Sequence, residues 1–67
     1  MPYILSIEPT GELAYVHGYH LGTNLRVARR IAERVFHDRN RENRPTTSVS
    51  LVLNHTIDST YDGDWYS

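Results

Sequence analysis

Arginine is the residue type in this chain whose number and spacing could do chemistry, since the 67 residues include seven arginines and no lysine. Four of them, Arg26, Arg29, Arg30 and Arg34, recur at intervals of three and four residues, which places them on one side of a helix. Guanidinium groups donate paired hydrogen bonds to carboxylates and phosphates. These side chains therefore predict a surface that contacts an acidic protein or, alternatively, a nucleic acid.

The charge of the chain is unevenly distributed, although its net value is only −1. Residues 26–44 hold all seven arginines against three acidic residues, a net charge of +4, while both flanking segments are acidic. A pI near 6.4 and the lack of a helix-turn-helix, finger or RNA-binding signature disfavour a nucleic-acid-binding module. An acidic protein partner is the favoured interpretation, although the codon usage of a GC-rich genome would also explain the arginine bias.

Other kinds of chemistry have little support in the sequence. The chain has no cysteine, which excludes disulfides and thiolate metal sites. His17 and His20 flank a glycine instead of sharing a helix face, and His37 and His55 stand apart, so we expect no metal site. No nucleophile elbow or glycine-rich phosphate loop is present. We therefore predict a non-enzymatic protein without a cofactor.

The arginines require a helix to hold them, and residues 24–38 have the pattern of one. The apolar residues of this segment cover its opposite side: Leu25, Val27, Ala28, Ile31, Ala32, Val35 and Phe36. Thr23 or Asn24 supplies an oxygen that can cap the first amide groups. The polar segment 38–45, closed by Pro45, predicts the end of the helix and an exposed loop.

Two runs before the helix have the composition of strands. Residues 3–8 and 12–17 are separated by a Pro-Thr-Gly turn and predict a hairpin that pairs Ile7 with Leu13. The face of this hairpin that we expect to meet the helix carries the larger side chains, among them Tyr3, Leu5 and Ile7.

Residues 46–53 predict a third strand, with Val49, Leu51 and Leu53 on its buried face. The predicted fold is α+β in the order ββαβ, a three-stranded antiparallel sheet with the first strand central and one amphipathic helix on one face. A third strand parallel to the second and beside it is the alternative. This interpretation gives one domain at 1–53, followed by an acidic, aromatic tail or flap at 54–67.

A single helix covers only one face of a sheet, so the other face needs a different cover. Ile4, Val16 and Val52 lie there among small residues and predict a weakly apolar surface for a partner or a second copy. Because so short a chain buries little apolar surface, we expect a homodimer. Trp65 and Tyr66 in the acidic tail are a further contact, either with the basic groove of a partner or with the arginine helix of the same chain.

Across its whole length the chain resembles the short, cysteine-free accessory proteins encoded by bacteriophages of GC-rich hosts such as actinobacteria. The resemblance lies in the length, the arginine bias and the ββαβ layout, and it assigns no role to any residue. It implies a non-enzymatic protein that binds and perturbs a host component. Residues 1–7 lack the basic start of a signal peptide, and no stretch is long enough to span a bilayer, so we expect a cytoplasmic protein without membrane contact.

Overall fold

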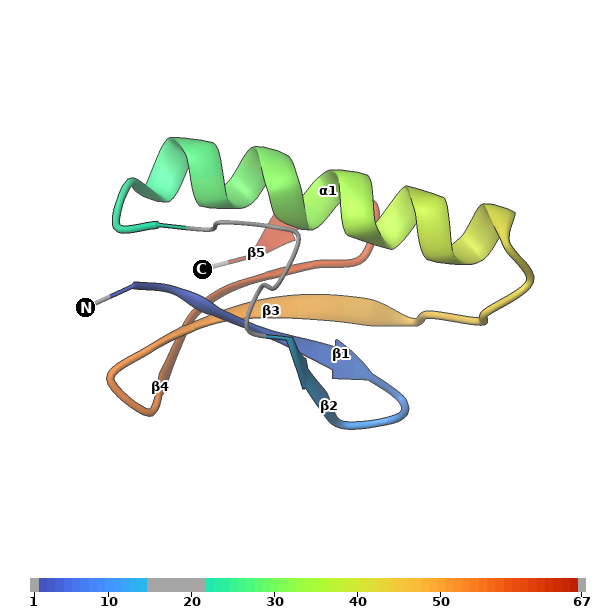
Figure 1. Ribbon diagram of the computed structural model, residues 1–67, viewed down its shortest axis with the longest axis horizontal. Coiled ribbons are helices and arrows are strands. Elements are labelled where there is room, and N and C mark those ends of the chain that lie inside the picture. Colours follow the sequence, from blue (N-terminus) through green and yellow to red (C-terminus); the bar gives the residue numbers. More distant parts are fainter. Residues whose placement is uncertain (1, 15–21, 67) are drawn as a thin grey trace.

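One helix lies across one face of an antiparallel sheet in the computed structural model, which describes residues 2–14 and 22–66 (Figure 1). The elements in chain order are β1 (Ile4–Glu8), β2 (Glu12–Ala14), α1 (Leu25–Arg41), β3 (Ser48–Leu53), β4 (Thr56–Tyr61) and β5 (Trp65–Tyr66). The fold is therefore α+β, with one helix packed on an antiparallel sheet, as the sequence predicts.

Within the described residues the sheet has five strands in the order β2-β1-β3-β4-β5, and every neighbouring pair is antiparallel. The prediction of three strands in the order ββαβ is wrong, because the segment expected as a tail or flap contributes β4 and β5 to the sheet. β1 does lie between β2 and β3, as expected, and the parallel alternative for the third strand does not occur.

A tight hairpin connects β3 to β4. Asn54 and His55 both have positive φ angles, 52° and 64°, and they join the paired residues Leu53 and Thr56. Two consecutive left-handed residues form the type of turn whose twist matches that of the flanking strands. Of these two residues, only Asn54 is of a type that commonly occupies such a turn, because histidine is unusual at its second position.

The hairpin of β1 and β2 differs from the predicted register by one residue. Ile7 pairs with Glu12 and Ser6 pairs with Leu13, whereas Ile7 was expected opposite Leu13. Gly11 has a φ of 74° and donates its N–H to the carbonyl of Ile7 at 2.7 Å, which closes the turn one residue earlier. Residues 15–17, also expected in this strand, lie outside the residues that the structure describes.

The core lies between α1 and the sheet face that the sequence assigned to it. Its buried apolar residues are Tyr3, Leu5, Ile7, Ala28, Ala32, Val35, Val49, Leu51 and Tyr61. Ala28 and Ala32 have no exposed surface, and their short side chains let the helix backbone approach the sheet closely. Because of this close contact, a larger side chain at either position would disturb the packing of the helix on the sheet.

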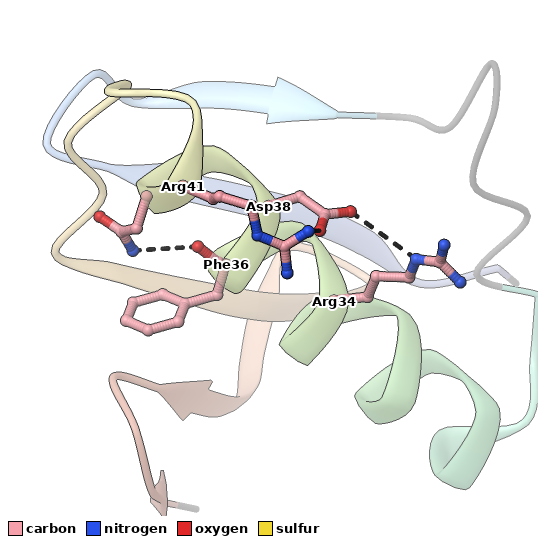
Figure 2. A network of polar contacts seen from close by, with 5 residues as sticks. Arg34, Phe36, Asp38 and Arg41 are labelled. Carbon is pink, nitrogen blue, oxygen red and sulfur yellow. Dashed lines mark hydrogen bonds and ion pairs between the residues drawn. The ribbon is translucent and has the colours of Figure 1, made fainter.

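The helix begins as predicted and ends later than predicted. Asn24 is the N-cap, since its Oδ1 accepts the N–H of Val27 at 3.2 Å. The helix continues beyond Asp38 to Arg41. The Asp38 carboxylate forms ion pairs with Nε of Arg34 and with a terminal guanidinium nitrogen of Arg41, each at 3.7 Å, and Figure 2 shows these three side chains. Within residues 2–14 and 22–66, no helix is both long enough and apolar enough to cross a bilayer.

Arg39, expected in an exposed loop, is instead on the buried side of the last turns of α1. Only 9% of its surface is exposed, and its Nε–H donates to Oγ1 of Thr46 at 3.0 Å. Thr46 is also buried, and its hydroxyl donates to the carbonyl of Arg44 at 2.9 Å. Arg39 lies seven residues after Ala32, which places both on the same side of the helix. This pair therefore fixes the end of the helix to the chain that enters β3.

Replacing Arg39 with alanine should lower the free energy of unfolding by about 1–3 kcal/mol, because Thr46 would lose a buried hydrogen bond to a charged group. Replacing Arg41, whose side chain is 78% exposed, should change it by less than about 0.5 kcal/mol. Urea denaturation followed by circular dichroism measures both values. Equal losses in the two variants would contradict the structural role assigned to Arg39.

Candidate functional site

A groove of about 590 Å³ lies between the first half of α1 and Trp65 of β5. We call it the arginine groove, and its lining residues are Leu25, Arg26, Arg29, Arg30, Glu33 and Trp65. It brings together three of the four arginines predicted to bind a partner with one of the two predicted tail aromatics. These side chains were named from the sequence, which left open whether the tail contacts the arginine helix of its own chain or a partner.

Trp65 forms one wall of the arginine groove and is held from three directions. Its indole N–H donates to Oε2 of Glu33 at 3.1 Å. Its ring lies 5.0 Å from the ring of Tyr61, and the guanidinium carbon of Arg29 is 5.2 Å from its centroid. A cation over an indole face is an attractive arrangement. Trp65 thus contacts the arginine helix of its own chain, which was one of the two interpretations of the tail.

Arg29 differs from the expectation that the arginines point to solvent. Its side chain is half-buried against Trp65, and within the described residues its Nε atom is buried without a hydrogen-bond partner. Glu33 lies four residues later, at a spacing that favours an ion pair with Arg29, but within the described residues its carboxylate accepts the Trp65 N–H and makes no ion pair with Arg29. Packing against the indole restricts the rotamers of Arg29 and so fixes where its charge lies.

Arg26 and Arg30 are exposed on the open side of the arginine groove. Within residues 2–14 and 22–66, neither makes an ion pair or a hydrogen bond through its side chain. Among the described lining residues, three arginines and the single carboxylate of Glu33 give the groove a net charge of +2. Its cationic side chains are therefore available to an anionic ligand.

Arg34, the fourth predicted contact, lies outside the arginine groove. It lines a second hollow of about 330 Å³ together with Asp38, Arg41 and Glu42. Here two arginines face two carboxylates, and Asp38 lies 3.7 Å from each arginine. The second hollow is therefore neutral, and three of its four charged side chains, Arg34, Asp38 and Arg41, form ion pairs with one another.

The sheet face away from the helix, which we call the outer face, carries a row of apolar residues. The strand register aligns Ile4, Val52 and Ile57 across β1, β3 and β4. Ile57 is 62% exposed, and Tyr66, also placed on this face by its pairing with Thr60, is 57% exposed. Ile57 was missed because its segment was not recognised as a strand. Val16, predicted on this face, lies outside the described residues.

The next row of the outer face is made of hydroxyl groups. Ser50 pairs with Ser6 on one side and with Thr60 on the other, and the Ser50 and Thr60 hydroxyls are 2.8 Å apart. Ser50 is buried although it lies outside the core. The hydrogen bond satisfies these polar groups within the sheet, which explains how β4 forms without an alternating apolar pattern.

Tyr61 supports Trp65 from the core. Its ring lies edge-on to Phe36 at 5.2 Å, and its hydroxyl is 3.2 Å from Nε2 of His37. Burial raises the pKa of the Tyr61 phenol, and the carboxylates of Glu33, Asp64 and Asp62 raise it further. The neutral phenol is therefore the form that the folded protein favours.

No metal site is indicated in the part of the chain that the structure describes. There, no three histidine or acidic side chains gather closely enough to hold an ion. His17 and His20 lie outside these residues.

Comparisons with known proteins do not supply a function. No protein-family model matches the chain. No curated protein and no solved structure is significantly similar to it. The resemblance to bacteriophage accessory proteins is not tested by these comparisons and stays a prediction.

Stability should depend on the ionisation of Tyr61 at high pH. Because its folded pKa lies above the unfolded value near 10, the neutral phenol stabilises the fold fully below about pH 10, and this contribution is lost as the pH rises through the folded pKa. Urea denaturation at increasing pH should therefore show a steeper loss for the wild type than for Tyr61→Phe, which cannot ionise. Parallel curves for the two proteins would contradict this assignment.

Proposed function

We propose that this chain is a small, non-enzymatic binding protein that contacts an acidic protein partner through the arginine groove. The observation that carries the proposal is the convergence of three arginines on one groove in which, among the described lining residues, only Glu33 opposes them. The resemblance to bacteriophage accessory proteins adds a host protein as the source of this partner.

The groove suits carboxylate groups because its donors are not used elsewhere in the described structure. Within the described residues the guanidinium groups of Arg26 and Arg30 make no hydrogen bond, so each can bind a carboxylate of a ligand through two parallel hydrogen bonds. Arg29 is held against Trp65, so less conformational entropy is lost when a ligand binds it. One cation packed against Trp65 and two exposed cations therefore combine fixed placement with adaptability.

A protein partner fits the surroundings of the groove better than a nucleic acid does. The carboxylates of Glu33, Asp62 and Asp64 contribute to the raised pKa of the Tyr61 phenol. Their negative charges therefore lie near the ring of Tyr61, which packs against Trp65. A nucleic-acid backbone carries a regular array of negative charges and would meet these carboxylates as well as the arginines. A protein segment can place its few carboxylates on the arginines alone. The net charge of −1 on the whole chain favours the same conclusion.

Replacing Arg26 and Arg30 together with glutamine should weaken binding of polyglutamate at least about tenfold, because hydrogen bonds between charged groups are worth roughly 1.5–3 kcal/mol. Trp65 is the only tryptophan and lines the groove, so its fluorescence reports binding directly. The matched control replaces Arg34 and Arg41, which removes the same charge from the neutral second hollow and should leave the affinity nearly unchanged.

Equal losses in the two double variants would show that net charge, not the groove, governs binding, and would overturn the proposal. Duplex DNA is the competing ligand in the same assay. Tighter binding to DNA than to polyglutamate, with a steep loss of affinity as salt increases, would replace the protein partner with a nucleic acid.

We propose that the outer face is a second contact surface, used for self-association. Its support is the apolar row of Ile4, Val52 and Ile57, together with the exposed ring of Tyr66 at the end of the neighbouring hydroxyl row. A sheet face with an apolar row that no other described segment covers is suited to pairing with its own copy about a two-fold axis.

Light scattering after size exclusion should show a dimer for the wild type and a monomer for Ile57→Asp, because the new carboxylate would be buried without a partner. Val27→Asp is the control, since Val27 is also exposed, at 46%, but lies on the helix. A wild-type monomer, or dissociation by both variants alike, would exclude the outer face as the dimer contact.

A further inference from the structure

We infer that the ligand of the arginine groove is an extended acidic segment of the partner, which joins the sheet as a sixth strand beside β5. This inference rests on the proposed function and adds the conformation and the sequence pattern of the ligand. It follows from the position of the groove at the β5 edge of the sheet, from the positive charges of the arginines of α1 that line the groove, and from the alternation of side chains in β5.

The sheet is open next to the groove. β5 is the last strand in the order, and it pairs only with β4, through Tyr61 with Trp65 and Thr60 with Tyr66. Within the described residues no strand covers its other edge. The backbone N–H and C=O groups of an edge strand can pair with an added strand, which is a common way to bind an extended peptide. Because β5 is short, the side chains of the groove must supply much of the affinity.

The groove lies above this open edge, on the helix side of the sheet. Trp65 belongs to β5 and also forms the wall of the groove, so an added strand would run directly past it. Arg26, Arg29 and Arg30 line the same groove from the first turns of α1, and the first turn of α1 contains no acidic residue. The positive end of the helix dipole therefore adds to the attraction for a negative segment.

The alternation of side chains in a strand then defines the sequence pattern of the ligand. Trp65 lies on the helix side of the sheet and Tyr66 on the outer face. In an added strand, every second side chain would likewise lie on the helix side, where the arginines are. The residues between them would lie beside Tyr66, where β-branched side chains pack well. The geometry thus points to acidic residues at alternate positions, separated by β-branched residues.

The fluorescence of Trp65 tests this pattern with three synthetic peptides of equal length. One alternates glutamate and threonine, the second has the same composition in the repeat Glu-Glu-Thr-Thr, and the third alternates lysine and threonine. We expect the alternating acidic peptide to bind about tenfold or more tightly than the repeat of paired residues, since the latter places half of its glutamates on the wrong face. The lysine peptide should not bind.

Backbone methylation tests the pairing with β5. Two versions of the alternating acidic peptide carry N-methyl groups, one on every glutamate and the other on every threonine. Because N–H groups on alternate residues of a strand point in opposite directions, one version should lose binding and the other should retain it. Both versions share the conformational effect of methylation, so each is the control for the other.

The outcomes separate this inference from the proposed function. Equal binding of the alternating and paired-residue peptides, or of both methylated peptides and the unmodified one, would overturn strand addition. If the affinity still fell on replacing Arg26 and Arg30, the proposed function would stand. If replacing Arg26 and Arg30 left the affinity unchanged, both strand addition and the proposed function would be overturned. Strand addition is supported when the affinity depends on the order of residues in the peptide, on which alternate residues carry N-methyl groups, and on Arg26 and Arg30.

Discussion

The width of a single helix limits how much of this sheet can be covered, and the surfaces of the molecule follow from that limit. A helix is about 10 Å wide and strands are spaced at about 4.8 Å, so one helix covers two or three strands. This sheet has five. β5 is reached from α1 only because Trp65 is long enough to contact both Arg29 and Glu33. The arginine groove is the space left where the helix no longer covers the sheet.

The charges of α1 are arranged differently along its length. In the second half, Asp38 pairs with Arg34 and Arg41, and these exposed pairs contribute little beyond local order (Figure 2). In the first half, the Glu33 carboxylate accepts the N–H of Trp65, and within the described residues it makes no ion pair with Arg29, one turn earlier. One hydrogen bond to an indole therefore fixes the wall of the groove and occupies the carboxylate that could otherwise pair with Arg29.

The parts of the fold that local patterns determine could be predicted from the sequence. The cap at Asn24, the buried face of α1 and the inward positions of Leu5, Val49 and Leu51 follow from periodicity over a few residues. β4 was missed because Ser59 and Thr60 interrupt its apolar pattern. Ser59 is 1% exposed, and Thr60 bonds to Ser50 on the next strand. Such polar positions are explained only by their neighbours, which no local pattern reveals.

The candidate site could likewise be predicted from the sequence only in part. Four of its six residues, Arg26, Arg29, Arg30 and Trp65, were singled out by their type and spacing, but their meeting depends on contacts between residues more than thirty positions apart. Arg29 was placed in solvent because a helical wheel contains no information about a side chain arriving from another element. The burial of Arg39 was missed for a related reason, since the helix extends one turn further than its polar sequence indicated.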